Sequence, residues 1–145
     1  MTQFLNLIAT LSAAFFAGGA TYVSLAEHPA RLADPAIALR QFQLSYPRAA
    51  RWQASMAALC LLTAVVATWL GAGWWCTIGG LAVGAVIPFT LIVMKPLNHR
   101  LLDQTIPLTT AEAAALLRRW GQLHWVRSLL GALGLLILLA SNGVR

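Results

Sequence analysis

The chain has few charged residues: they make up 10% of its 145 residues, and only four of them are acidic. Hydrophobic residues make up 59%, and the mean hydropathy is +0.73. Ordinary soluble domains carry about 25% charged residues, so this composition excludes that class of protein. We therefore expect a membrane protein whose main partner is the lipid bilayer.

The chain has only two cysteines, Cys60 and Cys76. They belong to successive apolar segments and lie at different distances from the short connection between them, which predicts different depths in the membrane. Neither has the spacing of a metal ligand. We expect no disulfide and two small buried side chains.

Because acidic residues are scarce, the net charge is +6. The basic residues form no stripe or motif typical of nucleic-acid binding, so we expect the protein not to bind nucleic acid. Nine of the ten basic residues fall within residues 27–52 and 95–121 or at the border of the second range. The positive-inside rule then predicts that both segments are cytoplasmic connections and that both termini lie outside. This orientation suits a bacterial inner membrane.

Four apolar stretches can each cross about 30 Å of hydrocarbon as a helix. The stretches are residues 4–26, 53–70, 75–94 and 122–141. The connection between the second and third is short, which requires an antiparallel pair. The sequence predicts one domain over residues 1–145, an all-α antiparallel four-helix membrane bundle.

Prolines and caps predict where helices begin and end. Pro29 should end the first span, because proline removes a backbone donor and restricts the residue before it. Asp34 resembles an N-cap followed by proline, and the apolar residues after it predict a short helix lying on the interface in the first cytoplasmic connection. Pro88 should kink the third span, in which Gly80 and Gly84 have a spacing typical of helix packing.

One polar stretch stands out where the last span begins, Trp120-Gly-Gln-Leu-His124-Trp-Val-Arg127. Trp120, His124 and Arg127 are spaced at i, i+4 and i+7, which places them on one face of a helix. Polar groups at the edge of a hydrocarbon medium are costly unless they have partners. The other histidines, His28 and His99, also fall near predicted cytoplasmic helix ends, so an antiparallel bundle can gather all three.

Three segments together resemble the anthrone-oxygenase-like family of small four-helix membrane proteins. The segments are Gly-Gly-Ala-Thr-Tyr22 through Glu27-His-Pro-Ala-Arg31, then Pro96-Leu-Asn98-His-Arg-Leu101, then Trp120 through Arg127. Some members of that family oxidise anthrones to anthraquinones with molecular oxygen and without a metal or flavin. The resemblance marks Asn98, Trp120, His124 and Arg127 most clearly, then His28, and His99 less clearly.

The resemblance implies a planar hydrophobic phenolic or quinone-like substrate, molecular oxygen as co-substrate and no cofactor. Neutral His124 would be the general base, because an unperturbed imidazole titrates at about pH 6.5. Arg127 and Asn98 would donate hydrogen bonds to the developing oxyanion. The residues expected to bind the substrate are Trp120, Tyr22, His28 and Tyr46.

Two other interpretations stay open. In one, the protein is a membrane oxidoreductase whose transition metal is bound by His28, His99, His124 and Glu27, although these residues do not have the tight spacing typical of metal ligands. In the other, the chain is a non-catalytic membrane subunit or small-molecule binder whose polar residues anchor helix ends. The glycine spacing and the apolar exterior also allow a homo-oligomer or a membrane partner protein.

Overall fold

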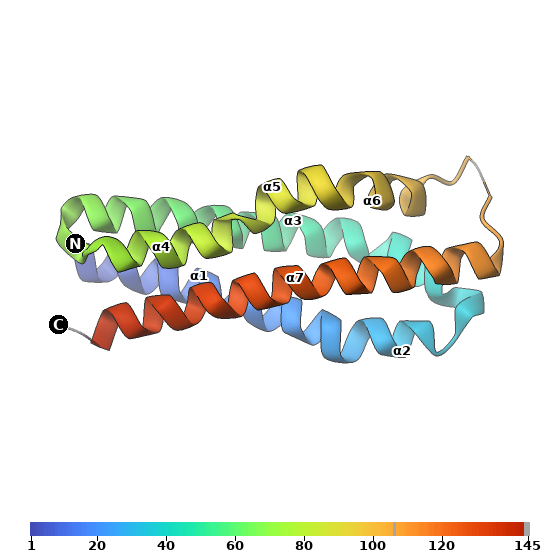
Figure 1. Ribbon diagram of the computed structural model, residues 1–145, viewed down its shortest axis with the longest axis horizontal. Coiled ribbons are helices and arrows are strands. Elements are labelled where there is room, and N and C mark those ends of the chain that lie inside the picture. The colour runs from blue at the N-terminus through green and yellow to red at the C-terminus, as the bar shows by residue number, and fades with distance from the viewer. Residues whose placement is uncertain (106, 144–145) are drawn as a thin grey trace.

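The protein is a bundle of four helical rods that run alternately up and down (Figure 1). The computed structural model describes residues 1–105 and 107–143. The first rod comprises α1 (Thr2–Tyr22), η1 (Val23–Glu27) and α2 (His28–Leu32), and the second α3 (Pro35–Ala67) and η2 (Thr68–Ala72). The third comprises α4 (Trp74–Gly84), α5 (Val86–Phe89), η3 (Thr90–Met94) and α6 (Lys95–Leu102), and the fourth is α7 (Thr110–Gly143). Segments labelled η are π-helical, except that Gly71 within η2 has a left-handed backbone with φ 95°.

Within the described residues, four helical rods are long and apolar enough to cross a membrane, so the chain is an integral membrane protein. Large apolar side chains such as Leu62, Ile92 and Leu129 are exposed on the outside, where lipid replaces water. The rod from Pro35 to Ala72 has 38 residues. At 1.5 Å per residue it is about 57 Å long, well beyond the roughly 30 Å of hydrocarbon. One end of the bundle therefore projects from the membrane.

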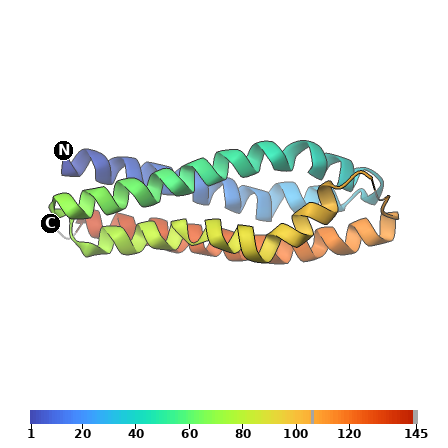
Figure 2. The same ribbon diagram turned by 90° about the horizontal axis from the view of Figure 1, so that it is seen from above.

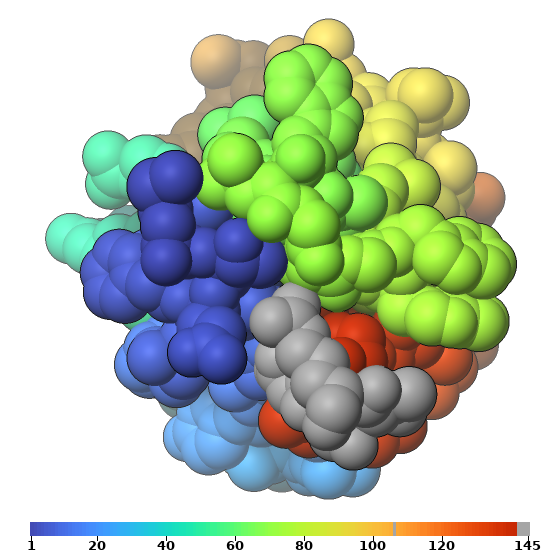
Figure 3. Space-filling model, turned by 90° about the vertical axis from the view of Figure 1, so that its left-hand side faces the viewer, coloured from blue at the N-terminus to red at the C-terminus, as the bar shows by residue number. Residues whose placement is uncertain are grey.

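Each rod packs against two neighbours, in the cyclic order of first rod, α3, α4 and α7. Seen from above, the first rod and α3 lie on one side, and the third and fourth rods lie on the other (Figure 2). α1 begins near the turn between η2 and α4 at one end of the bundle, which Figure 3 faces. The α2–α3 turn and the α6–α7 connection lie at the opposite end (Figure 1).

The half of the bundle near that α1 end is packed through small residues. Its core cluster is mostly alanine, and the side chains of Cys60 and Cys76 are buried in it, as predicted. A Cβ on Gly80 would lie 2.6 Å from the Cβ of Ala64, and one on Gly84 would lie 2.8 Å from Leu61 Cδ2. The predicted packing role of these two glycines is confirmed, because they let α4 approach α3 closely.

Gly134 of α7 gives a direct test of this packing. Gly134→Ala is expected to lower the free energy of unfolding by about 1–3 kcal/mol, because the added methyl overpacks the core. Its Cβ would meet Val83 Cγ2 at 2.5 Å and the carbonyl oxygen of Gly79 at 2.7 Å. The measurement is unfolding in detergent by circular dichroism.

The control is Gly18→Ala, because nothing lies within 4 Å of a Cβ added there. Alanine is the better helix former, so Gly18→Ala should raise the stability by about 0.5–1 kcal/mol. Equal effects of the two substitutions would contradict the packing account.

Two predicted helix boundaries are wrong. The first rod does not end at Pro29 but continues to Leu32, and no separate helix lies on the interface after Asp34, because α3 runs unbroken through Pro47. Ahead of Pro29, the wider turns of η1 replace the α-helical bonding that its ring would obstruct. Of the apolar residues assigned to that helix, Phe42 is fully buried in the bundle, whereas Ile37 and Leu44 are exposed on the outside of α3.

Other boundaries follow the sequence. The interruption at Ala85, between α4 and α5, confirms the kink expected from Pro88. The α7 helix begins with a capping box: the Thr109 amide donates to the Glu112 carboxylate at 2.9 Å, and the Glu112 amide donates to Thr109 Oγ1 at 3.3 Å. Before it, hydrogen bonds from Thr105 hold the pKa of the Asp103 carboxyl below its ordinary value.

Candidate functional site

A group of buried polar side chains lies where α1 passes through η1 into α2. All four rods contribute to it, and each of its members has at most 7% of its surface exposed. Its members are Ser24, His28, Arg31, Gln53, Asn98, His124, Arg127 and Ser128. Burying this many polar groups is costly unless they pair with one another or with a ligand, so the group is a candidate site.

Trp120 is the centre of an aromatic cluster in this region. Its ring stacks on His124 with a centroid distance of 4.6 Å and an interplanar angle of 27°. Phe42 meets it edge-on at 5.2 Å and Tyr46 at 6.1 Å. On another side Trp120 contacts the His28 ring at 5.1 Å, and its indole N–H donates to Asn98 Oδ1 at 3.0 Å. These contacts fix the plane of the indole and of the adjacent imidazole.

His124 is held by two serines. Ser24 Oγ lies 3.1 Å from Nδ1 of His124 and 2.9 Å from Ser128 Oγ, and the Ser128 hydroxyl donates to the His124 carbonyl at 3.4 Å. A hydroxyl has one proton, so with Ser128 donating to the carbonyl, Ser24 donates to Ser128 and accepts from Nδ1–H. This arrangement favours the tautomer with its proton on Nδ1 and leaves the Nε2 lone pair for a ligand.

Ser24→Ala is expected to shift the His124 tautomers. Loss of one hydrogen bond of about 1 kcal/mol changes their ratio about fivefold, toward the form with its proton on Nε2. The measurement is the ¹⁵N chemical shifts of ring-labelled histidine, assigned with single His→Gln variants. Ser12→Ala, at another buried serine of the same rod, is the matched control. Identical His124 shifts in Ser24→Ala and the unaltered protein would contradict the arrangement.

Arg127 is a buried cation, with 4% of its surface exposed. Its Nη2 donates to Gln53 Oε1 at 2.7 Å, and its guanidinium carbon lies 5.8 Å from the centre of the Phe16 ring. Its Nε is buried without a hydrogen-bond partner. Among the described residues, the structure pairs Arg127 with no carboxylate. A guanidinium in this condition favours binding an anion.

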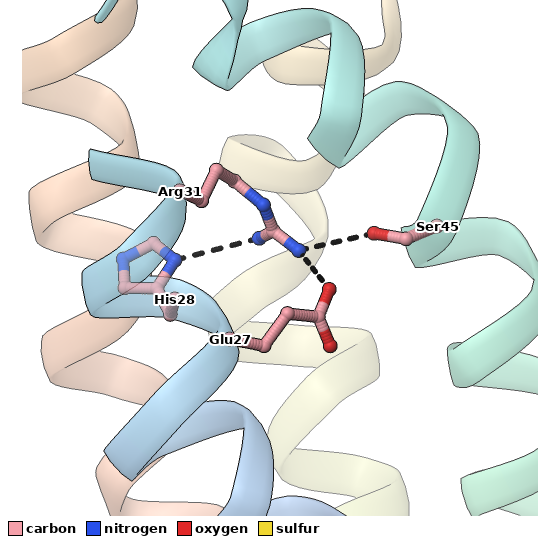
Figure 4. Close-up of polar contacts among 4 residues, drawn as sticks. All are labelled: Glu27, His28, Arg31 and Ser45. Atoms are coloured by element: carbon pink, nitrogen blue, oxygen red, sulfur yellow. Dashed lines mark hydrogen bonds and ion pairs between the residues drawn. The ribbon is translucent and has the colours of Figure 1, made fainter. Parts of the chain in front are cut away.

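A second buried arginine, Arg31, has a different set of partners (Figure 4). Its Nη2 forms an ion pair with Glu27 and donates to Ser45 Oγ at 3.0 Å. Its Nη1 lies 3.4 Å from Nδ1 of His28. Arginine only donates, so Nδ1 of His28 accepts and the imidazole is neutral in this contact.

The aromatic cluster, His124 and both arginines enclose a cavity of about 20 Å³, which is room for about one water molecule. Its lining residues are Val23, Glu27, Arg31, Phe42, Ser45, Tyr46, Ala49, Ala50, Gln53, Trp120, His124 and Arg127. An imidazole, two guanidinium groups, one carboxylate and three aromatic rings therefore line one small volume. Such a site can remove a proton from a planar molecule and stabilise the anion that results.

The part of the chain that carries most of these residues is similar to a known protein family. Residues 42–137 match the sequence profile of the family described as anthrone oxygenase. The chain belongs to this family. The match covers about two thirds of the chain and confirms the resemblance carried by the sequence motifs. No curated protein and no solved structure is significantly similar to the chain.

The part matched to the anthrone oxygenase family contains α7 with Trp120, His124 and Arg127, whereas His28 and Arg31 precede it. Of the residues that the sequence singled out, Trp120, His124, Arg127 and Tyr46 line the cavity, and His28 packs behind Trp120. His28 can pack this closely against α7 because residue 121 is glycine: a Cβ on Gly121 would lie 2.5 Å from His28 Nε2.

Three of the predicted site residues do not line the cavity. Asn98 is absent from the cavity lining and instead accepts from Trp120, so it positions the indole. Tyr22 is 61% exposed and lines an outer groove. His99 is exposed on α6. The metal interpretation needed His99 beside His28, His124 and Glu27, and no group of three such ligands is present among the described residues.

Four buried polar residues of this anthrone oxygenase family member were not predicted as site residues. Ser128 had a signal, since it follows His124 by one helical turn. Gln53 also had a signal, since it is a polar residue at the start of an apolar span. Ser24 had no signal, because a small hydroxyl in a membrane helix is ordinary, and Arg31 was treated as an interfacial charge because Pro29 was expected to end the helix.

Proposed function

We propose that the protein oxidises a planar hydrophobic carbon acid of the anthrone type with molecular oxygen, without a cofactor, at the cavity beside His124. The observation that carries this proposal is the buried Arg127 guanidinium, which pairs with no carboxylate of residues 1–105 and 107–143 and lies on the same cavity as the imidazole. A base that abstracts a proton and a cation that stabilises the resulting oxyanion are what this oxidation needs.

The proposed reaction balances with oxygen alone. Nε2 of His124 takes a proton from the ring CH₂, and the carbanion delocalises onto the ring oxygen as an anion that faces Arg127. One electron passes from this anion to O₂, and the radical and superoxide combine into a peroxide. The protonated His124 returns its proton to the outer peroxide oxygen. His124 then takes the second hydrogen of that carbon as a proton while the C=O bond forms and the O–O bond breaks, and the hydroxide that leaves takes this proton to become one molecule of water.

The remaining residues orient these groups. Ser24 and Ser128 hold the His124 tautomer, and Gln53 holds Arg127. Trp120, Phe42 and Tyr46 offer ring faces and edges to a flat substrate. Because the cavity measures about 20 Å³, a three-ring substrate binds there only after some of the lining side chains move.

A second cavity borders Arg127 and is suited to dioxygen. It measures about 70 Å³ and is otherwise lined by Ala50, Ala54, Val86, Ile87, Thr90 and Leu91. Its lining is almost wholly apolar, and dioxygen is a small apolar molecule. In the proposal, oxygen reaches the site from the lipid side, and the substrate enters from the end of the bundle rich in basic residues, which faces the cytoplasm of a bacterial cell.

The test is oxygen uptake by the purified protein in detergent with a hydroxylated anthrone. The expected result is one O₂ consumed for each anthraquinone formed, at a rate above the spontaneous oxidation and unchanged after dialysis against a chelator. A rate equal to the protein-free background would overturn the enzymatic proposal and favour the non-catalytic binder. Activity that chelation removes and iron, copper or zinc restores would favour the metal oxidoreductase.

A further inference from the structure

An open groove lies on the outside of the bundle between the first rod and α3. It measures about 590 Å³, within the range of roughly 300–1,000 Å³ typical of sites for small organic molecules. Its lining residues are Tyr22, Ala26, Glu27, Ala30, Arg31, Gln41, Leu44 and Ser45. The exposed Tyr22 ring and the Leu44 side chain give it apolar surface, and Arg31 gives it a cation.

The groove and the inner cavity share three lining residues, Glu27, Arg31 and Ser45. In Figure 4 the Arg31 side chain extends from α2 toward Ser45 of α3, and the Glu27 carboxylate lies beside it. These three side chains therefore form the wall between the two volumes. Arg31 contacts both of the other side chains in this wall, so it is the residue that joins Glu27 of the first rod to Ser45 of α3.

Arg31 is suited to exchange partners. Only 4% of its surface is exposed, and its Nε is buried without a hydrogen-bond partner. The Glu27 side chain that balances its charge is 33% exposed. Because the Glu27 carboxylate is partly exposed, it can return to water when it leaves Arg31, so an acidic oxygen on a ligand can take its place.

We propose that this groove is the first binding site for a planar aromatic molecule with an acidic oxygen, and that Arg31 exchanges Glu27 for that oxygen as the molecule passes to the inner cavity. The inference rests on the proposed function for the identity of the ligand. It gives the exposed Tyr22 a role, as a ring against which the flat molecule stacks before it reaches Trp120.

The first test fills the groove. Ala26→Trp is expected to weaken binding of dihydroxyanthraquinone, measured by quenching of tryptophan fluorescence, by at least about tenfold. The matched control is Leu25→Trp: Leu25 is the preceding residue of η1, is 63% exposed and does not line the groove. It should bind like the unaltered protein. Equal affinities of the two variants would overturn the groove site and leave the proposed oxidation standing.

The second test addresses the exchange at Arg31. Glu27→Gln removes the competing carboxylate and is expected to tighten binding of an anthraquinone carboxylate by about tenfold, while neutral anthraquinone binds as before. Equal changes for both probes, or none, would overturn the exchange.

A third measurement distinguishes failure of the proposed groove site from failure of the proposed oxidation. Binding of dihydroxyanthraquinone that is sensitive to Ala26→Trp, with no anthrone oxidation, would support the groove and overturn the proposed reaction. No binding to the unaltered protein would overturn the groove. Displacement of the probe by phosphatidylglycerol in micelles, at lower lipid concentration in Glu27→Gln than in the unaltered protein, would instead assign Arg31 to a lipid headgroup.

Discussion

His124→Gln is expected to lower the rate of anthrone oxidation by about 10²–10⁴-fold while the protein stays folded. Glutamine has nearly the volume of histidine and retains groups that can hydrogen-bond to Ser24. It has no basic nitrogen, so the carbon acid must lose its proton to water. The measurement is the initial rate of anthraquinone formation at saturating oxygen, with folding checked by gel filtration and thermal unfolding.

The control is His99→Gln, which removes the same group from an exposed position on α6. Its rate should equal that of the unaltered protein. A His124→Gln variant with full activity would mean that another base, or none, takes the proton. An equal loss in both variants would restore the metal interpretation, in which His99 and His124 act together.

Arg127→Met combined with Gln53→Leu is expected to lower kcat by about 10²–10³-fold, the range measured for loss of one oxyanion-stabilising donor. The two partners are replaced together because a single change would leave the other polar group buried and unpaired. Exchange of a buried polar pair for apolar groups is often neutral or stabilising. The midpoint of thermal unfolding should therefore stay the same or rise, while activity falls.

Arg119→Gln is the control for Arg127, since it removes a cation from an exposed position of the same helix. This substitution should change neither kcat nor the midpoint of thermal unfolding. Arg127→Lys should recover part of the lost rate, because the charge returns without the planar fork of donors. A double variant that loses stability and activity together would indicate that Arg127 only supports the fold.

The bundle was predictable because the membrane allows few solutions. Long apolar runs must become helices, and the short connection after Gly71 requires an antiparallel pair. The boundaries were harder to predict. Pro29 and Pro47 are usually read as helix ends, yet the chain continues through both. Around Pro47 tertiary packing supports the continuous helix, because Phe42 and Tyr46 in the turn before it both contact Trp120 of α7.

The site was predictable where one helix carried the pattern. The spacing of Trp120, His124 and Arg127 places them on one face, and all three line the cavity. The partners from other rods were not predictable, because the sequence does not state how each helix is rotated about its axis. Asn98 and Tyr22 were on the right helices, and rotation directs Asn98 to the Trp120 indole and leaves Tyr22 in the outer groove.

The π-helical segments η1 and η3 each end two residues before a proline, Pro29 and Pro96. A widened turn of this kind holds one residue more than an α-helical turn, which offsets the following side chains by about 100° around the axis. When relatives are aligned, one that lacks the proline should also lack one residue before it. A gap placed elsewhere in the first rod would superpose the wrong side chains on Glu27 and Arg31.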